Sequence, residues 1–429
     1  MNIIERGREF VQSLRELMQR TVWEWRRCPH CGSTLTHKNG SYTRRPWTFE
    51  GRQEVRVQRH CCEQCQRNYS ERSALLVSGS WYAREVRRCA VDWWQHGGSS
   101  LRRAAEMMRS FVGRQERWQW WRPLDEPPRP AVRCRLAAST VHRWLDQAGQ
   151  VAQRSIEGQL EGIGATEKVG ADGLWARLRG ETKRVVLLVV DSVSGLVFPP
   201  VVATGEEGTR PWQALFVRAR AAGLDLEGLR GVTSDGAHGL AVYLRERLSW
   251  VQQQRCVWHL WRNLGRELRH IAAQASQGLE GEAAKQFRQQ LGDELARLIH
   301  AVVDAASYAQ GEQALEALRA HAWGGSLAQT LNAQLDSVLA HLVDYYGGLQ
   351  RVAPEWCWRD FRLRLSRGRN HCSDERLERA ALVWAIYRNF TPAQRRSERK
   401  RRYRHPGQSP LQVAGVPPGN ISYLDALGV

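Results

Sequence analysis

The sequence predicts an α/β core that is interrupted by an all-helical insertion and preceded by a cysteine-rich segment and a helical domain. Within residues 165–260, three consecutive strand-like segments are followed by alternating helix-like and strand-like segments, which is typical of an α/β sheet. Residues 261–350 are rich in Ala, Leu, Gln and Glu and contain no proline, which favours packed helices. Half of the ten cysteines lie within residues 28–65, which indicates metal binding rather than disulfides.

Length and charge limit the class of protein. The chain has 429 residues, enough for several domains. It has no run of about 18 apolar residues, and its first 20 residues are charged throughout, so we expect a soluble, intracellular protein. The formal net charge is +19, and the first 150 residues carry 27 basic and 15 acidic side chains, a net +12. Such an excess favours a polyanionic partner, most simply nucleic acid, and no membrane.

Two C-x-x-C pairs predict one structural zinc ion. Cys28 and Cys31 form the first pair, and Cys62 and Cys65 form the second. Each pair can present two thiolates from one turn, and four thiolates complete a tetrahedron, which leaves no position for a substrate. Gly32 suits the turn after the first pair, and the spacing resembles a zinc ribbon. The alternatives are a reduced, metal-free cluster or a rival ligand from among His30, His37, His60 and Cys61.

Residues 1–155 read as an N-terminal helix, a hairpin and a helical domain. Residues 1–27 have helical spacing, and the segment "GSYTRRPWTFEGRQEVRVQRHC" alternates like a hairpin that turns near Glu50 and Gly51. Three helices follow, "WYAREVRRCAVDWWQHG", "SSLRRAAEMMRSF" and "LAASTVHRWLDQAGQVA". Ser99 or Ser100 is expected to cap the second helix, and Ser139 or Thr140 the third.

The second and third helices resemble a helix-turn-helix that is split by an insertion, although a plain helical linker would give the same pattern. In the first reading, the following side chains face phosphates and base edges: Arg102, Arg103, Ser139, Thr140, His142 and Arg143. The insertion carries four prolines and a cluster of tryptophans, Trp118, Trp120 and Trp121, which we expect to pack against their own domain rather than stack on bases.

The predicted core begins near residue 165. Its first three strands are "EKVGADGLWARLRG", "TKRVVLLVVDSV" and "GLVFPPVVAT", and the continuous apolar run of the second is typical of a strand covered on both faces. A helix, a strand that ends at Asp235, a second helix and the strand "SWVQQQRC" follow. After the helical insertion we expect two closing helices, "EWCWRDFRLRLSRG" and "DERLERAALVWAIYRNF". The final segment, "PGQSPLQVAGVPPGNISYLDALGV", reads as loop.

These observations divide the chain into six expected regions. They are the N-terminal helix and zinc ribbon (1–75), the helix-turn-helix-like domain (78–155), the first part of the core (165–260), the helical insertion (261–350), the closing helices of the core (351–390) and a basic C-terminal tail (391–429).

Three segments resemble the core of Mutator-like insertion-sequence transposases. They are "ADGLWARLRG", "GEEGTRPWQALFVRARAAGLDLEGLRGVTSDGAHGL" and "QQQRCVWHLWRNL". The family has a first Asp in strand one, a second Asp before a Gly-Leu-containing helix, and C-x-x-H leading into Arg-Asn. The positions that match are Asp172, Asp235, Cys256, His259, Arg262 and Asn263. The C-x-x-H spacing is therefore read as this signature rather than as a second zinc site.

The resemblance implies a ribonuclease H-like fold and DDE chemistry. In such a sheet the first and fourth strands lie side by side, so Asp172 and Asp235 converge and hold two Mg²⁺ (or Mn²⁺) ions per active site. His259 is expected near the scissile phosphate, and Cys256 beneath it. Asp191 is the next candidate in this set of strands.

Glu355 is the predicted third acid, because Pro354 suits a helix start just ahead of it. Family members usually have an Asn shortly before this Glu, whereas this sequence has Val and Ala. Glu375 and Glu378 are rivals for the third acid, although their segment reads as the solvated face of an amphipathic helix.

The implied function is a transposase that binds terminal inverted repeats and target DNA as a homodimer or higher oligomer, in the cytoplasm of a prokaryote and associated with the nucleoid. The alternatives are an inactive, domesticated DNA-binding regulator and a nuclease without strand transfer. The segment "RRSERKRRYRH" is expected to contact phosphates, through Arg399, Lys400, Arg401 and Arg402, or else to be a solvated tail.

Overall fold

The computed structural model describes most of the chain, in two compact units. The described residues are 27–97, 100–112, 134–160, 163, 167–178, 183–205, 207–343, 349–351, 361–362, 373–392, 407–416 and 421–429. The first unit comprises residues 1–145 together with Val429, and the second comprises residues 146–428. The expected N-terminal helix, the tryptophan cluster, Glu355 and the segment 395–405 lie outside the described residues.

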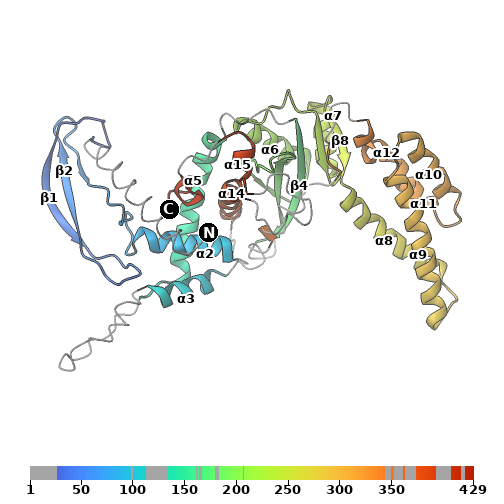
Figure 1. The fold of residues 1–429 in the computed structure, drawn as a ribbon, viewed down its shortest axis with the longest axis horizontal. Coiled ribbons are helices and arrows are strands. Elements are labelled where there is room, and N and C mark those ends of the chain that lie inside the picture. The colour runs from blue at the N-terminus through green and yellow to red at the C-terminus, as the bar shows by residue number, and fades with distance from the viewer. Residues whose placement is uncertain are drawn as a thin grey trace. The chain divides into compact units, whose positions relative to one another are not determined.

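The first unit opens with an antiparallel sheet of strand order β1-β2-β3. Its strands are β1 (Thr36–Arg44), β2 (Val55–Cys62) and β3 (Asn68–Ser70). The hairpin between β1 and β2 turns where the sequence predicts, because the Thr48 amide donates to the Gly51 carbonyl at 2.8 Å. The hairpin and the short β3 bring both C-x-x-C segments to one end of this sheet. Figure 1 shows β1 and β2 side by side.

Three helices follow the sheet, as predicted. They are α2 (Arg84–Gly97), α3 (Leu101–Phe111) and α5 (Ala138–Gln159), the last of which begins in the first unit and continues into the second. Ser100 caps α3 by accepting from the Arg103 amide. The predicted cap of the third helix is wrong, because α5 begins at Ala138 and both Ser139 and Thr140 lie inside it.

The second unit is built on a five-stranded sheet of order β6-β5-β4-β7-β8. Its strands are β4 (Lys168–Arg177), β5 (Lys183–Asp191), β6 (Val201–Thr204), β7 (Gly231–Ser234) and β8 (Gln252–Arg255). The first three strands pair antiparallel, whereas β7 runs parallel to β4, and β8 runs parallel to β7. Residues 185–190 of β5 are fully buried, as their apolar run predicts.

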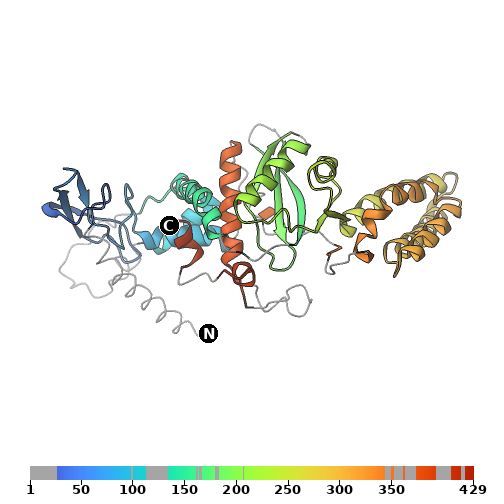
Figure 2. The ribbon, with the colours of Figure 1, turned by 90° about the horizontal axis from the view of Figure 1, so that it is seen from above.

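Helices α6 (Thr209–Ala221), α7 (His238–Arg247) and α14 (Asp374–Phe390) surround this sheet. Both α6 and α14 pack against β5 and β6, and α7 packs against α6. The β4 strand lies to the right of α6 in Figure 1, and Figure 2 shows the same sheet from above. Asp172 lies in the middle of β4, and Asp235 directly follows β7.

The predicted insertion is helical throughout its described part. It contains α8 (Val257–Ala275), α9 (Gly281–Val303), α10 (Tyr308–Ala320), α11 (Gly325–Asn332), α12 (Leu335–Val338) and the short helix η1 (Ala340–Leu342). Leucines from α8 to α12 form its own hydrophobic core, with Leu264, Leu295 and Leu318 fully buried. In both views these helices lie beyond the β8 edge of the sheet.

The C-terminal segment is not the loop that its composition suggests. Two short helices, α15 (Pro410–Val413) and α16 (Tyr423–Ala426), each begin with a capping box. The Ser155 hydroxyl of α5 donates to the Ala426 carbonyl, and Leu427 is fully buried. Each of these helices has only four residues, which is too short for composition or periodicity to predict it. No helix among the described residues is long and apolar enough to cross a membrane.

Candidate functional site

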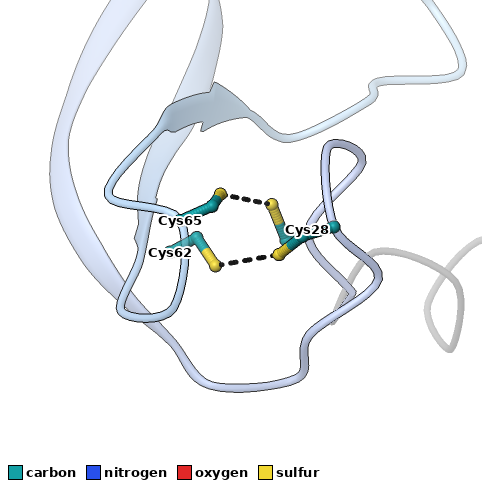
Figure 3. Close-up of side chains that lie close together, drawn as sticks. Cys28, Cys62 and Cys65 are labelled. Carbon is teal, nitrogen blue, oxygen red and sulfur yellow. Dashed lines mark hydrogen bonds between the residues drawn. The ribbon is translucent and has the colours of Figure 1, made fainter.

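Four cysteine sulfurs converge at one end of the first sheet. The Sγ atoms of Cys28 and Cys65 lie 3.6 Å apart, those of Cys31 and Cys62 lie 3.5 Å apart, and all four lie within 4.8 Å of one another (Figure 3). A disulfide would require about 2.05 Å between sulfurs. A tetrahedral zinc ion with bonds of about 2.3 Å would hold its sulfurs about 3.8 Å apart. The four cysteines therefore form a group that could bind a structural metal such as zinc.

The two cysteine pairs lie in turns of the same kind. The Cys28 carbonyl accepts from the Gly32 amide at 2.9 Å, and the Cys62 carbonyl accepts from the Gln66 amide at 2.9 Å. Gly32 and Gln66 both have left-handed backbone, with φ of 77° and 56°. The backbone amide of Cys65 lowers the pKa of the Cys62 thiol to about 6, so this thiol readily forms the thiolate that binds metal. At Cys31 the lowering effect of the Ser33 amide is outweighed by burial and by hydrogen bonds with the other thiols, which raise the pKa of that thiol.

Two of the four rival ligands, His37 and His60, have other partners. His37 lies 3.4 Å from the Glu63 carboxylate, and the His60 ring stacks on Tyr69 with centroids 5.4 Å apart. Among the described residues, the four cysteines are the only group of three or more His, Cys, Asp or Glu side chains placed to hold a metal ion.

Asp172 and Asp235 occupy matching positions in neighbouring parallel strands. Ala171 of β4 pairs with Ser234 of β7, so each aspartate directly follows a paired residue. Adjacent strands lie about 4.8 Å apart. Each carboxylate is oriented by a backbone amide close to it, since Gly173 N donates to Asp172 Oδ1 and Ala237 N donates to Asp235 Oδ1, both at 2.9 Å. Only 2% of Asp172 is exposed, whereas Asp235 is half-buried.

The first turn of α8 lies beside these carboxylates. The Cys256 amide donates to the Ser234 carbonyl at 2.7 Å, which fixes the start of α8 next to the end of β7. Cys256 is fully buried, as expected, and His259 is half-buried with its ring edge-on to Trp258 at 4.7 Å. The Arg262 guanidinium lies over the Trp258 ring, 5.5 Å from its centroid. Cys256 and His259 gather no further metal ligands from the described residues.

Two charged residues at this strand end are not predicted by the sequence. Glu207 lies against Gly173, because a Cβ on that glycine would stand 2.7 Å from the Glu207 carboxylate. Arg255 lies against Gly236 in the same way, with Nη1 1.7 Å from the position of a Cβ. The local signal is the glycine that directly follows each predicted catalytic aspartate, since it leaves room for a side chain that is distant in the sequence.

Glu207 does not lie beside Asp172. Side chains alternate along β4, so Gly173 faces Glu207 on the side of the sheet opposite to Asp172. Burial and the nearby Asp235 carboxylate raise the pKa of Glu207 to about 7, while hydrogen bonding with the Trp175 side chain acts in the opposite direction. Glu207 is therefore a largely protonated neighbour of Asp235 below neutral pH.

The other candidate carboxylates contact groups outside the Asp172 and Asp235 site. Asp191 accepts from the Ser194 amide at 2.7 Å and so caps the turn after β5. Glu378 pairs with Arg218 of α6, which corrects the view that its helix face is solvated. Glu375 is exposed and lies 3.7 Å from Arg379.

The predicted DNA-contacting residues in the described part of the first unit are mostly accessible. Arg102 and Arg103 are exposed on α3. On α5, Ser139 and Arg143 are exposed, whereas Thr140 and His142 are half-buried. Their contact with DNA stays a prediction.

Comparison with known proteins gives one family match for the region that contains Asp235. No curated protein matches the chain. Residues 200–352 match the family model described as transposase, Mutator family. The match spans β6 to the end of the described insertion and includes Asp235, Cys256 and His259. Asp172 lies outside it in β4, and Glu355 lies shortly after its end. This part of the chain is therefore similar to transposases of the Mutator family.

Proposed function

We propose that the protein is a DNA transposase that binds terminal inverted repeats, cleaves donor DNA and transfers the freed 3′-OH to target DNA by DDE chemistry. The observation that carries this proposal is that Asp172 and Asp235 directly follow Ala171 and Ser234, which pair across the adjacent parallel strands β4 and β7. The Mutator family match, which begins in β6 and runs through Asp235 and the C-x-x-H signature, supports it.

The sheet supports a ribonuclease H-like core. Three antiparallel strands come first in the sequence, and the fourth and fifth strands add in parallel on the other side of the first. This order puts the first and fourth strands side by side, which DDE chemistry requires of its two aspartates. The helical insertion then follows β8, as it does in the family the sequence resembles.

Asp172 and Asp235 fit divalent magnesium or manganese, because carboxylate oxygens are the hard donors that these ions require. When bound, two such ions would activate the nucleophile and stabilise the leaving oxygen of a phosphodiester. Glu355 would supply the third carboxylate. The chain itself orients the first two carboxylates through the Gly173 and Ala237 amides. The helix start at Cys256 would bring His259 toward the scissile phosphate.

The cysteine cluster would stabilise the first sheet, and the basic residues would bind DNA. A zinc ion at the four cysteines would join the turn before β1 to the turn between β2 and β3. The exposed basic residues of α3 and α5, together with the segment 395–405, would contact phosphates. A homodimer or higher assembly on the two element ends would follow from the same function.

The test is an assay of strand cleavage and joining on the element's own ends, with Mg²⁺ or Mn²⁺. Asp172→Asn and Asp235→Asn keep the side-chain shape but remove the charge, so each should abolish cleavage while end binding persists. Asp225→Asn, on an exposed loop, is the matched control and should cleave at the parental rate. Cleavage that survives either active-site substitution would contradict the proposal, and cleavage without joining would identify a nuclease instead.

A further inference from the structure

Arg255 is a buried arginine at the end of β8, next to the end of β7 that leads into Asp235. It is the last residue of β8 and pairs with Ser234, the residue just before Asp235. Only 9% of Arg255 is exposed, and its Nε and Nη1 atoms are buried without a hydrogen-bond partner among the described residues. Buried polar atoms are nearly always satisfied in folded proteins. An arginine with two unsatisfied buried donors therefore calls for an explanation.

The backbone around Asp235 is shaped to receive this side chain. Gly236 has a left-handed backbone, with φ of 80°. A Cβ on Gly236 would overlap with the Arg255 guanidinium, so a larger residue there would force the guanidinium to move. The guanidinium thus lies against the backbone next to Asp235, in space that the glycine leaves free.

Without a bound anion, the buried position of Arg255 does not stabilise the folded protein. Burial lowers the pKa of Arg255, and the charges of Asp235 and Cys256 act in the opposite direction. An arginine nevertheless stays protonated at neutral pH. Burying a charge whose donors are unsatisfied destabilises the folded state. Such a charge is most useful when a bound anion completes its hydrogen bonds, because charge-assisted hydrogen bonds in a site of low dielectric are strong.

We propose that Arg255 forms an anion subsite that binds a phosphate group of the nucleic acid strand held at Asp235. This inference rests on the proposed function, which brings a phosphodiester to that strand end. The planar guanidinium matches phosphate oxygens in geometry as well as in charge. It also offsets the repulsion that the carboxylates of Asp172 and Asp235 exert on an approaching phosphate. Arg255 is thus a substrate-binding residue of the site, whereas the carboxylates are its metal ligands.

A purely structural role for Arg255 makes a different prediction. If the guanidinium only held Asp235 in place, removing it would destabilise the protein when no anion is present. If Arg255 is a phosphate subsite, Arg255→Gln should be at least as stable as the parental protein in phosphate-free buffer, because the substitution removes a buried unsatisfied charge. Denaturant unfolding of the full chain without phosphate separates the two roles.

Phosphate binding is the direct test. Inorganic phosphate is titrated into the full-length protein by calorimetry at constant ionic strength, with and without Mg²⁺. Arg255→Gln should weaken the phosphate Kd roughly 10- to 100-fold, the loss expected for hydrogen bonds to a charged group. Arg255→Lys keeps the charge but not the planar donors, so its Kd should fall between the two. Arg269→Gln, an exposed arginine of α8, is the matched control and should keep the parental Kd.

A parental phosphate Kd in Arg255→Gln would overturn the inference, as would a large loss of stability in phosphate-free buffer. If Arg255→Gln does not fold, the Arg255→Lys titration decides, and a parental Kd there overturns the inference as well. The outcome is separable from the proposed function. If the parental protein cuts no DNA but Arg255→Gln still weakens phosphate binding, only the proposed function is contradicted. If Arg255→Gln cuts DNA with the parental KM and kcat, only the phosphate subsite is contradicted.

Discussion

Cys61 and Cys62 are neighbours in β2 whose side chains have different surroundings. Cys62 is fully buried and its sulfur joins the group of four, whereas Cys61 is half-buried and its thiol lies 3.9 Å from the Cys62 carbonyl. Successive side chains of a strand point to opposite faces, so only one of the two can reach the metal position. This adjacent pair is a natural control for the zinc assignment.

We expect Cys62→Ser to lose most of the bound zinc and Cys61→Ser to retain about one zinc ion per chain. The reason is that three thiolates hold zinc less tightly than four. Metal analysis of the purified variants measures this directly. Full zinc content in Cys62→Ser would show that the four cysteines are not the ligands.

Glu207 predicts a pH dependence of stability. Its pKa is about 7 in the folded protein against an ordinary value of 4.5. Between these values the unfolded chain loses the proton while the folded chain keeps it, so the free energy of unfolding falls as pH rises through this window. Glu207→Gln mimics the protonated acid and should remove this decline, so its stability relative to the parental protein should increase from pH 4.5 to 7.

Denaturant unfolding across that pH range measures the effect. Glu227→Gln, whose side chain is 86% exposed, is the control and should follow the parental pH profile. A stability difference between Glu207→Gln and the parental protein that stays constant with pH would contradict the shifted pKa.

At the scale of elements, α14 is fastened to the sheet by polar contacts as well as by its apolar face. The Asn389 side chain is 2% exposed and bonds both backbone groups of Val197, accepting from its amide at 2.8 Å and donating to its carbonyl at 2.9 Å. Arg379 pairs with Asp146 of α5 at 2.9 Å. A helix that reads as solvated from its charges is therefore a central support of the second unit.

Asn389→Ala should lower the free energy of unfolding by roughly 2–4 kcal/mol, because two buried backbone groups of Val197 would then lack their partners. Glu375→Gln on the same helix changes an exposed side chain and should stay within about 0.5 kcal/mol of the parental value. Both are measured by denaturant unfolding at neutral pH. Equal stability of the two variants would show that the Val197 hydrogen bonds contribute little.

At the scale of the whole molecule, the net charge of +19 is unevenly spread along the chain. The first 150 residues carry a net +12, and residues 395–405 add seven basic residues with one acidic residue. Charge of this kind attracts nucleic acid of any sequence, in proportion to the phosphates neutralised. Sequence-specific recognition would then depend on a smaller set of residues.

Neutralising Arg399, Lys400, Arg401 and Arg402 should weaken DNA binding to a similar degree on all sequences. The slope of log K against log salt should become shallower by up to about 0.9 for each phosphate that the protein no longer neutralises. Fluorescence anisotropy with unrelated duplexes over a range of salt concentrations gives both quantities. A slope identical to that of the parental protein would mean that this segment does not contact phosphates.

Local patterns predict most of the described elements. The apolar run of β5, the alternation of β1 and β2 and the helical spacing of α2, α3, α6 and α7 each follow from residues that are close in sequence. The short α15 and α16 escape such patterns because four-residue helices have too few turns to show a period. The predicted Ser139 or Thr140 cap fails because the helix begins one residue before the first of them.

Spacing, periodicity and turn glycines are sufficient to predict the cysteine pairs and most of the strands and helices, and the resemblance singles out Asp172 and Asp235. Which side chains fill the space beside those aspartates depends instead on tertiary contacts. Glu207 and Arg255 reach Gly173 and Gly236 through contacts between segments far apart in the chain, and burial there sets their charge. No local pattern encodes such contacts, because they depend on how the strands pair and what the pairing removes from water.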